Sequence, residues 1–172
     1  IVYPSDRSRQ SEVEEAIFST LSGVQAWYKD QVGKTFRFAD SLRVVDSLKT
    51  ETEINGNWQE AILASNNGAF GVLRIRVDLY FLDVDGEITY GGTLGAINAG
   101  YAVLGTNWLK KYSARGAVAH ELGHALGLNH PDSNQPQSDN IMGSNTETIN
   151  QWPNFNLSDS DKTTLLSSPY FR

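Results

Sequence analysis

The three histidines of this chain all lie within residues 120–130, whose sequence is HELGHALGLNH. Residues four apart on an α-helix share one face, so His120 and His124 can point their imidazoles at a common ion. Two metal ligands are then fixed by the helix alone. The spacing therefore predicts a metal site on a helix, and a helix with incidental histidines is the alternative.

The residues around this pair complete the pattern of a catalytic zinc site. Gly127 can adopt the left-handed conformation that ends a helix and turns the chain back, which makes His130 the third ligand. Glu121 is placed to reach a water in the open coordination position and is the natural general base. Structural zinc sites instead close all four positions and favour cysteine, which this chain lacks.

A family resemblance rests on these residues and on the one methionine of the chain. The string H-E-x-x-H-x-x-G-x-x-H, followed by Met142 in the segment 140–144, resembles the metzincin clan of zinc endopeptidases and its Met-turn. For Met142 alone, a core side chain is the alternative. The resemblance implies an α+β fold, a metzincin-like catalytic domain with a small twisted mixed sheet, an antiparallel edge strand, a zinc-site helix, a Met-turn and a C-terminal helix.

The same resemblance implies one catalytic domain over residues 1–172, with a larger N-terminal subdomain, 1–130, and a smaller C-terminal subdomain, 131–172. Composition agrees with a compact soluble protein, at 40% hydrophobic and 20% charged residues. The net charge of −6 argues against nucleic acid or an anionic membrane as a partner. No apolar run is long enough to span a membrane, and no basic and apolar leader opens the sequence, so we expect any signal or pro-segment to lie outside it.

Periodicity and turn residues predict the elements of the N-terminal half. We expect a strand at 1–3 and a helix over 11–32, with Ser11 as N-cap, Glu14 in a capping box and Gly33 as the stop. A second strand is expected from 35 to 45, a short helix over 57–64, and a long strand over 72–82.

Local signals also predict how the second half begins and ends. Asp85-Gly86 is typical of a two-residue hairpin turn between the strand 72–82 and a strand at 87–90. The last strand is expected at 101–104. Ser113 is the expected N-cap of the histidine helix, and Ser158 that of a final helix with acidic residues in its first turn.

The segment 91–96, GGTLGA, resembles the edge strand of matrixins, on which a peptide substrate pairs as an added β-strand. The resemblance implies that Leu94, Gly95 and Ala96 bind substrate, and a glycine-rich loop is the alternative. Matrixins often carry at the position of Ala96 a histidine that binds a second, structural zinc. Since all three histidines are already assigned, we expect one catalytic Zn²⁺ and no second histidine-bound zinc.

Further residues are assigned by comparison with matrixins and related subfamilies. Trp152 and Phe155 are candidates to shape the pocket for the substrate residue just after the cleaved bond, where the resemblance implies an apolar side chain. Asp161 matches an aspartate that supports the Met-turn backbone. Ser160 replaces the aspartate that receives the N-terminus in matrixins, and Ser144 replaces a tyrosine that serves as a fifth zinc ligand in astacins and serralysins.

Two other groups of residues leave alternatives open. The segment 83–87 resembles the start of a calcium loop but lacks its later oxygen ligands, so a plain hairpin is favoured and a structural Ca²⁺ is not established. Tyr90, Tyr101 and Tyr112 are candidate donors to the oxyanion, for which ordinary packing is the favoured alternative.

The function that the resemblance implies is a zinc-dependent endopeptidase, which hydrolyses internal peptide bonds by a zinc-activated water with Glu121 as general base. The alternative is a catalytically silent zinc-containing module that binds peptides or a partner protein. Glu121 argues against that alternative, because three histidines could hold zinc without it. The resemblance also implies protein or peptide substrates, control by a separate protein inhibitor or a removed pro-segment, a monomer, and an extracellular or periplasmic location.

Overall fold

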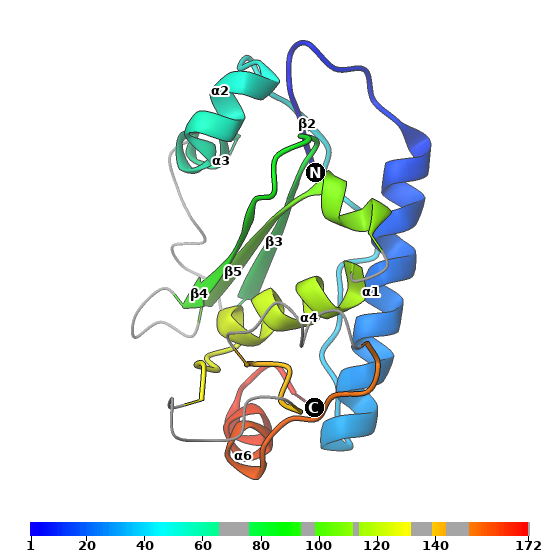
Figure 1. Cartoon of the computed structure of the whole chain (residues 1–172), viewed down its shortest axis with the longest axis vertical. Coiled ribbons are helices and arrows are strands. Elements are labelled where there is room, and N and C mark those ends of the chain that lie inside the picture. Colours follow the sequence, from blue (N-terminus) through cyan, green and yellow to red (C-terminus); the bar gives the residue numbers. More distant parts are fainter. Residues whose placement is uncertain (66–75, 94–98, 112–113, 132–138, 144–151, 172) are drawn as a thin grey trace.

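A computed structural model describes residues 1–65, 76–93, 99–111, 114–131, 139–143 and 152–171 of the chain. It is an α+β fold built on a small mixed sheet (Figure 1). In chain order the elements are β1 (Val2–Tyr3), α1 (Ser11–Val32), β2 (Val45–Asp46), α2 (Glu51–Gly56), α3 (Trp58–Ser65), β3 (Arg76–Leu82), β4 (Thr89–Thr93), β5 (Ala99–Gly105), the 3₁₀ helix η2 (Thr106–Lys110), α4 (Ala114–Ala125) and α6 (Asp159–Ser167).

The five strands are arranged in the order β2-β1-β3-β5-β4. All neighbouring strands are parallel except β4, which runs antiparallel to β5 from the pair Thr89 and Leu104 to the pair Thr93 and Gly100. The expectation of a mixed sheet with an antiparallel edge strand is therefore confirmed.

The predicted hairpin at Asp85-Gly86 is wrong, because β3 and β4 are not paired with each other. Strand β5 comes later in the chain and lies between them. A local turn signal indicates that the chain reverses its direction between two strands. It does not show whether a strand from later in the chain, here β5, pairs between them.

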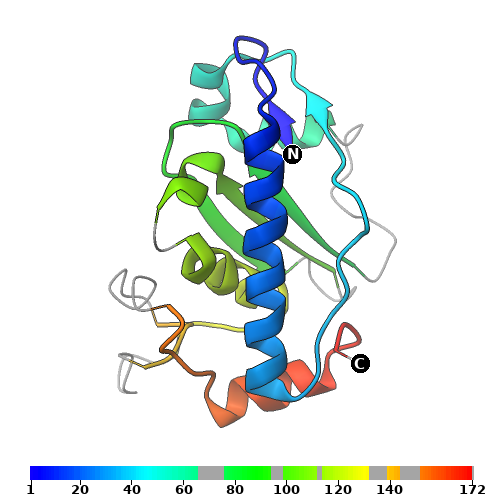
Figure 2. The ribbon, with the colours of Figure 1, turned by 90° about the vertical axis from the view of Figure 1, so that its right-hand side faces the viewer.

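The two faces of the sheet carry different layers. Along β5, Ala102 and Leu104 belong to the larger core with α1 and α4, whereas Val103 belongs to a smaller core with α2 and α3. Figure 2 shows α1 running along one side of the molecule over the length of the sheet. The sheet is thus covered on both faces, and α4 lies in the larger layer.

Helix α4 packs directly on the backbones of the last two strands. An ideal Cβ added at Gly91 of β4 would lie 2.1 Å from the carbonyl oxygen of Glu121 and 2.9 Å from the Cβ of His124. One added at Gly100 of β5 would lie 1.8 Å from the carbonyl oxygen of Ala125. Since no side chain fits at such separations, these two glycines set how closely the helix approaches the sheet.

Several predicted boundaries are confirmed. Strand β1 and helix α1 lie where they were expected, and Gly33 ends α1 with a left-handed φ of 75°. Ser158 caps α6: its side chain accepts a hydrogen bond from the Asp161 N–H, and the Asp161 carboxylate accepts one from the Ser158 N–H, which is a capping box. The expected residues 72–75 of the long strand and the N-cap Ser113 lie outside the described residues.

The predicted cap of α1 is wrong. The N-cap is Gln10, which makes no side-chain cap hydrogen bond, and Ser11 is already the first helical residue. Glu14 therefore stands one position too far along the helix to close a capping box. The Ser11 hydroxyl contacts the neighbouring Glu12 carboxylate instead.

The predicted strand from 35 to 45 is also wrong except at its end, because only Val45 and Asp46 pair, with β1. The aromatic residues that suggested a strand anchor an irregular connection to the core. Phe36 packs edge-on against Phe38 and against Tyr28 of α1. Their burial therefore reflects core packing and not a ladder of backbone hydrogen bonds.

Helix α2 was not foreseen, although its signal is present in the sequence. Thr50 accepts a hydrogen bond from the Glu53 backbone while the Glu53 carboxylate accepts from Thr50, which is a capping box. Within the described part of the chain, no helix is both long and apolar enough to cross a membrane.

We predict that Gly100→Ala lowers the free energy of unfolding by at least about 2 kcal/mol, because the added methyl group would overlap the Ala125 carbonyl. Gly56→Ala is the matched control, since a Cβ there meets no atom within 4 Å. Urea unfolding of both variants with saturating Zn²⁺ measures the difference. Equal midpoints for the two variants would contradict the packing described for α4.

Candidate metal centre

The end of α4 carries the chain from the helix histidines to His130. Gly127 has a φ of 99°, and the Leu128 N–H donates to the Gly123 carbonyl oxygen at 2.9 Å, as in a Schellman C-cap. A residue with a side chain rarely adopts such a φ. The predicted turn at Gly127 is therefore confirmed, and it brings His130 beside His120 and His124.

The three imidazoles converge through their Nε2 atoms. The Nε2 atom of His124 lies 3.1 Å from that of His120 and 3.0 Å from that of His130, and the third separation is 3.2 Å. These nitrogens form a nearly equilateral triangle. The predicted group of ligands is thus assembled in a form that could hold a metal ion.

Backbone carbonyls fix the protonation of two of these rings. The Nδ1 atom of His120 lies 2.7 Å from the Ile141 carbonyl oxygen, and that of His124 lies 2.9 Å from the Leu128 carbonyl oxygen. A carbonyl oxygen only accepts, so each Nδ1 carries the proton and each Nε2 presents a lone pair. Burial also lowers the pKa of His120 to about 4 and lowers that of His124, which keeps both rings neutral near pH 7.

Neutral rings with converging lone pairs repel one another unless a cation lies among them. Histidine nitrogens bind zinc at about 2.0–2.1 Å, so in a regular tetrahedron they lie about 3.3–3.4 Å apart. The observed separations of 3.0–3.2 Å are close to that value. The donor set and its spacing therefore fit a divalent metal that accepts imidazole ligands.

Exposure differs sharply among the three ligands. His120 is buried, His124 is half-buried and His130 is exposed. The centre is consequently enclosed on the side of α4 and open on the side of His130. Among the described residues only these three could serve as ligands, and three protein ligands with a fourth position left for water are typical of a catalytic zinc site.

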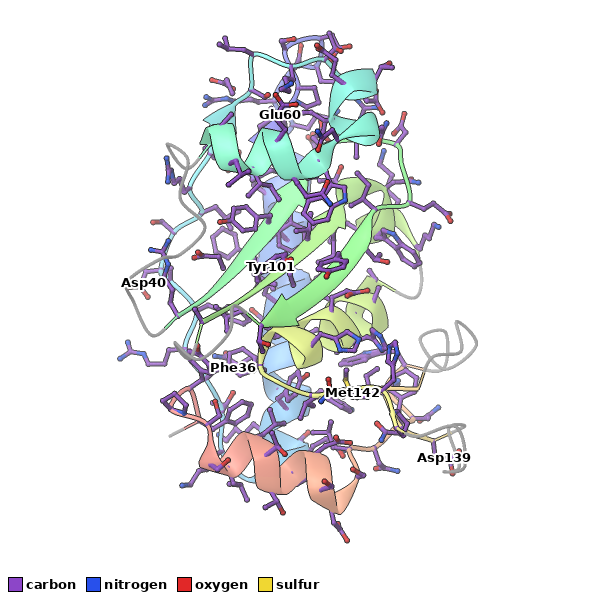
Figure 3. All side chains as sticks on the ribbon, turned by 90° about the vertical axis from the view of Figure 1, so that its left-hand side faces the viewer. Phe36, Asp40, Glu60, Tyr101, Asp139 and Met142 are labelled. Atoms are coloured by element: carbon purple, nitrogen blue, oxygen red, sulfur yellow. The ribbon has the colours of Figure 1, made fainter. Side chains whose placement is uncertain are left out.

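Met142 packs against the histidine helix α4 at Gly123. It is fully buried, and an ideal Cβ at Gly123 would lie 2.4 Å from its sulfur atom. In Figure 3 Met142 is labelled between α4 and α6. The preceding residue, Ile141, provides the carbonyl oxygen that orients the His120 ring. The segment 140–143 therefore helps to hold one of the three histidines in place.

Asn140 joins this segment to the C-terminal helix. Its side-chain oxygen accepts from the Met142 N–H at 2.8 Å, and its side-chain nitrogen donates to the Asp161 carboxylate at 3.0 Å. Asp161, which the sequence pointed to, therefore supports the Met142 backbone through Asn140. Sequence reasoning did not single out Asn140, because its role depends on two segments that meet only in the folded chain.

Glu121 follows His120 on α4 and is buried, with 8% of its surface exposed. Burial raises the pKa of its carboxyl to about 7, and a hydrogen bond with the Thr89 side chain opposes part of this rise. A carboxyl that titrates near neutrality can both accept and release a proton. Glu121 is therefore a candidate acid-base group on the same helix as two of the three histidines.

The predicted substrate residues Leu94, Gly95 and Ala96 lie outside the described residues. Strand β4, which leads to them, is the edge of the sheet next to the metal helix. Phe155 is 1% exposed and packs in the larger core, and Trp152 is half-buried against Trp27. Whether Trp152 and Phe155 shape a substrate pocket stays a prediction.

Two of the candidate oxyanion donors lie on the far face of the sheet. Gly91 and Gly100 face α4, so their neighbours Tyr90 and Tyr101 project to the opposite side, where their rings stack 5.7 Å apart. Figure 3 looks onto that face, with Tyr101 labelled on the sheet. The packing alternative is therefore favoured for both, while Tyr112, like Ser144, lies outside the described residues.

The acidic segment 83–87 contacts an arginine in this structure. Arg7 forms ion pairs of 2.6 Å with Asp85 and 2.7 Å with Glu51, and one of its nitrogens lies 3.8 Å from Asp83. Asp83 also accepts a hydrogen bond from Thr106 at 2.7 Å. These contacts connect the start of the chain to the end of β3, and they do not establish a calcium site.

The chain was compared with models of known protein families, with curated proteins and with solved structures, and none of the three comparisons found a match.

We predict that the protein binds about one Zn²⁺ per chain and that His130→Ala weakens this binding by more than about 100-fold, because loss of an outer-shell partner alone costs about 10–100-fold. His130 is exposed, so its replacement leaves the core intact. Competition with a chromophoric chelator measures the affinity. Asn129→Ala, at the exposed position just before it, should bind like the wild type; equal affinity of both variants would exclude His130 as a ligand.

We also predict that Asn140→Asp lowers the free energy of unfolding by about 1–3 kcal/mol, because it places two carboxylates where a donor met an acceptor. In the double variant with Asp161→Asn, the new asparagine amide can donate to the new carboxylate at position 140. This variant should therefore recover most of the lost free energy of unfolding. Urea unfolding of the four proteins tests the link. Additive losses in the double variant would show that the two side chains do not interact.

Proposed function

We propose that this chain is a zinc-dependent endopeptidase of the metzincin type that hydrolyses internal peptide bonds. The observation that carries the proposal is the triangle of three imidazole nitrogens, two of them on a helix that also carries the buried carboxyl of Glu121. Met142 beneath the histidine helix supports the same assignment. A structural zinc site would not need Glu121, which is not among the three ligands.

The chemistry divides between the ion and the side chains. Zinc, when bound, would lower the pKa of a water molecule toward neutrality and polarise the carbonyl of the peptide bond. Glu121 accepts a proton from the attacking water and then donates it to the nitrogen of the leaving amine. Its raised pKa suits both steps, because the same carboxyl must first take the proton and then give it up.

Strand β4 provides a place for the peptide substrate. It is the outer strand of the sheet, and at Gly91 it touches the backbone of Glu121. A peptide extended along this edge would form backbone hydrogen bonds and pass close to the metal centre. We propose protein or peptide substrates bound in this way, with the extracellular or periplasmic location that the resemblance implies.

We predict that the zinc-loaded wild type cleaves an unstructured protein such as casein and that Glu121→Gln lowers kcat/KM by about 10²–10⁴-fold, the usual contribution of a general base. The glutamine has nearly the same shape, so zinc binding should persist at about one ion per chain. Gel electrophoresis of casein and metal analysis of both proteins measure the two quantities.

Glu87→Gln is the control, because Glu87 is an exposed carboxylate that pairs with Lys111. It should cleave like the wild type. If the wild type and Glu121→Gln each hold one zinc and are equally inactive, the hydrolase proposal fails and the silent zinc-containing binding module takes its place.

A further inference from the structure

A cavity of about 580 Å³ lies between β3 and the chain that leads to β2. Two unbroken runs of residues line it, 37–43 before β2 and 76–81 of β3. Ile1 lines it as well, together with residues of α1 that include Phe18 and Leu21. Figure 2 shows β1 beside β2 near the N label, with the chain that leads to β2 passing along the sheet. The cavity therefore has the outline of a missing strand, and we call it the β1 slot.

The edge of β3 that borders the β1 slot has no partner strand over most of its length. Strand β5 pairs with all of β3, whereas within the described part of the chain β1 pairs with it only through Val2 and Leu82. At that end, Asp83 donates its N–H to the Val2 carbonyl oxygen at 2.9 Å. Backbone groups of alternate residues point to the same side of a strand, so those of Leu79 and Phe81 also point toward the slot. Such an edge is a template for one more extended chain.

The position of β1 shows how that chain would enter. The nitrogen of Ile1 donates to the Arg43 carbonyl oxygen at 2.6 Å, and the carbonyl oxygen of Ile1 accepts from the Val45 N–H at 2.9 Å. Residues joined to Ile1 would thus pass between the segment 37–43 and β3, parallel to β3 as β1 is. A separate peptide would have to end against Ile1. A joined strand needs no chain end inside the sheet.

The register of β1 determines which side chains would fill the cavity. Because Val2 lies opposite Leu82, the second and fourth residues before Ile1 would lie opposite Leu79 and Val77. These two side chains of β3 pack on the larger core with α1. Neighbouring residues of paired strands point to the same face, and the residues between them point to the other face. The cavity over α1 therefore requires apolar side chains at the second and fourth positions before Ile1.

We propose that the β1 slot receives a strand of about five residues that is joined to Ile1 and continues β1 along β3 as far as Arg76. Its backbone pairs with the open edge of β3, and its alternate apolar side chains fill the cavity. This strand takes no part in the proposed hydrolysis, since α4 packs on β4 and β5 whereas the slot borders the other side of β3.

The test adds five residues before Ile1 in two orders of the same composition. Thr-Val-Thr-Val-Thr places its valines at the second and fourth positions before Ile1, and Val-Thr-Thr-Thr-Val places them at the first and fifth. Both extensions lose the same backbone freedom on pairing. In excess Zn²⁺, the first protein should melt about 3–6 °C above the second, because only its valines enter the cavity. Equal melting temperatures would overturn the proposal.

Amide hydrogen exchange, followed by NMR, measures the pairing itself. With the Thr-Val-Thr-Val-Thr extension, the N–H groups of Leu79 and Phe81 should exchange at least about tenfold more slowly than in the 172-residue chain. The reason is that each N–H gains a backbone acceptor. Unchanged exchange at both residues would overturn the proposal even with a raised melting temperature, since side-chain contact alone would then explain the stabilisation.

A separate peptide tests the source of the strand. Acetyl-Thr-Val-Thr-Val-Thr at about 1 mM should leave the exchange of Leu79 and Phe81 unchanged in the 172-residue chain, because it lacks the effective concentration that a covalent joint provides. If the free peptide slows both amides as much as the joined extension does, the slot receives a separate polypeptide and the joined strand is excluded.

Discussion

The direct packing of α4 on the backbones of β4 and β5 is the contact on which the metal centre depends. Gly91 and Gly100 leave no side chains between the helix and the strands. The edge strand therefore lies against Glu121 and His124, the second of which belongs to the group that could hold a metal ion. The alternation along β4 then directs Thr89 toward α4 and Tyr90 away from it.

The centre also connects α4 to the C-terminal helix α6. One ring is oriented by the Ile141 carbonyl, which comes from the segment that Asn140 ties to Asp161 of α6. The second ring is oriented by the Leu128 carbonyl, in the turn that follows the helix. Both rings thus depend on backbone acceptors outside α4, so a helix with the same two histidines would not by itself hold them in place.

Much of the site could be predicted from the sequence because its information is local. The spacing of His120 and His124 defines one helix face, and Gly127 marks the turn that leads to His130. What escaped prediction depends on contacts between distant segments. The turn signal at Asp85-Gly86 predicted that β3 and β4 pair, but β5 lies between them. The aromatic residues of the segment 34–44 suggested a strand, although they pack in the core from an irregular segment. Helix α2 is a different case, since the Thr50 and Glu53 capping signal was readable in advance.

The graded exposure of the three ligands implies an order in which they exchange with solvent. His120 and His124 form a half-site that exists wherever α4 is folded and its two carbonyl partners are in place. His130 is contributed by the exposed chain beyond Gly127, so it is the ligand that solvent and competing chelators reach first. Metal would therefore enter and leave past His130, and the rate of exchange would report on the short segment between Gly127 and His130 more than on the stability of the fold.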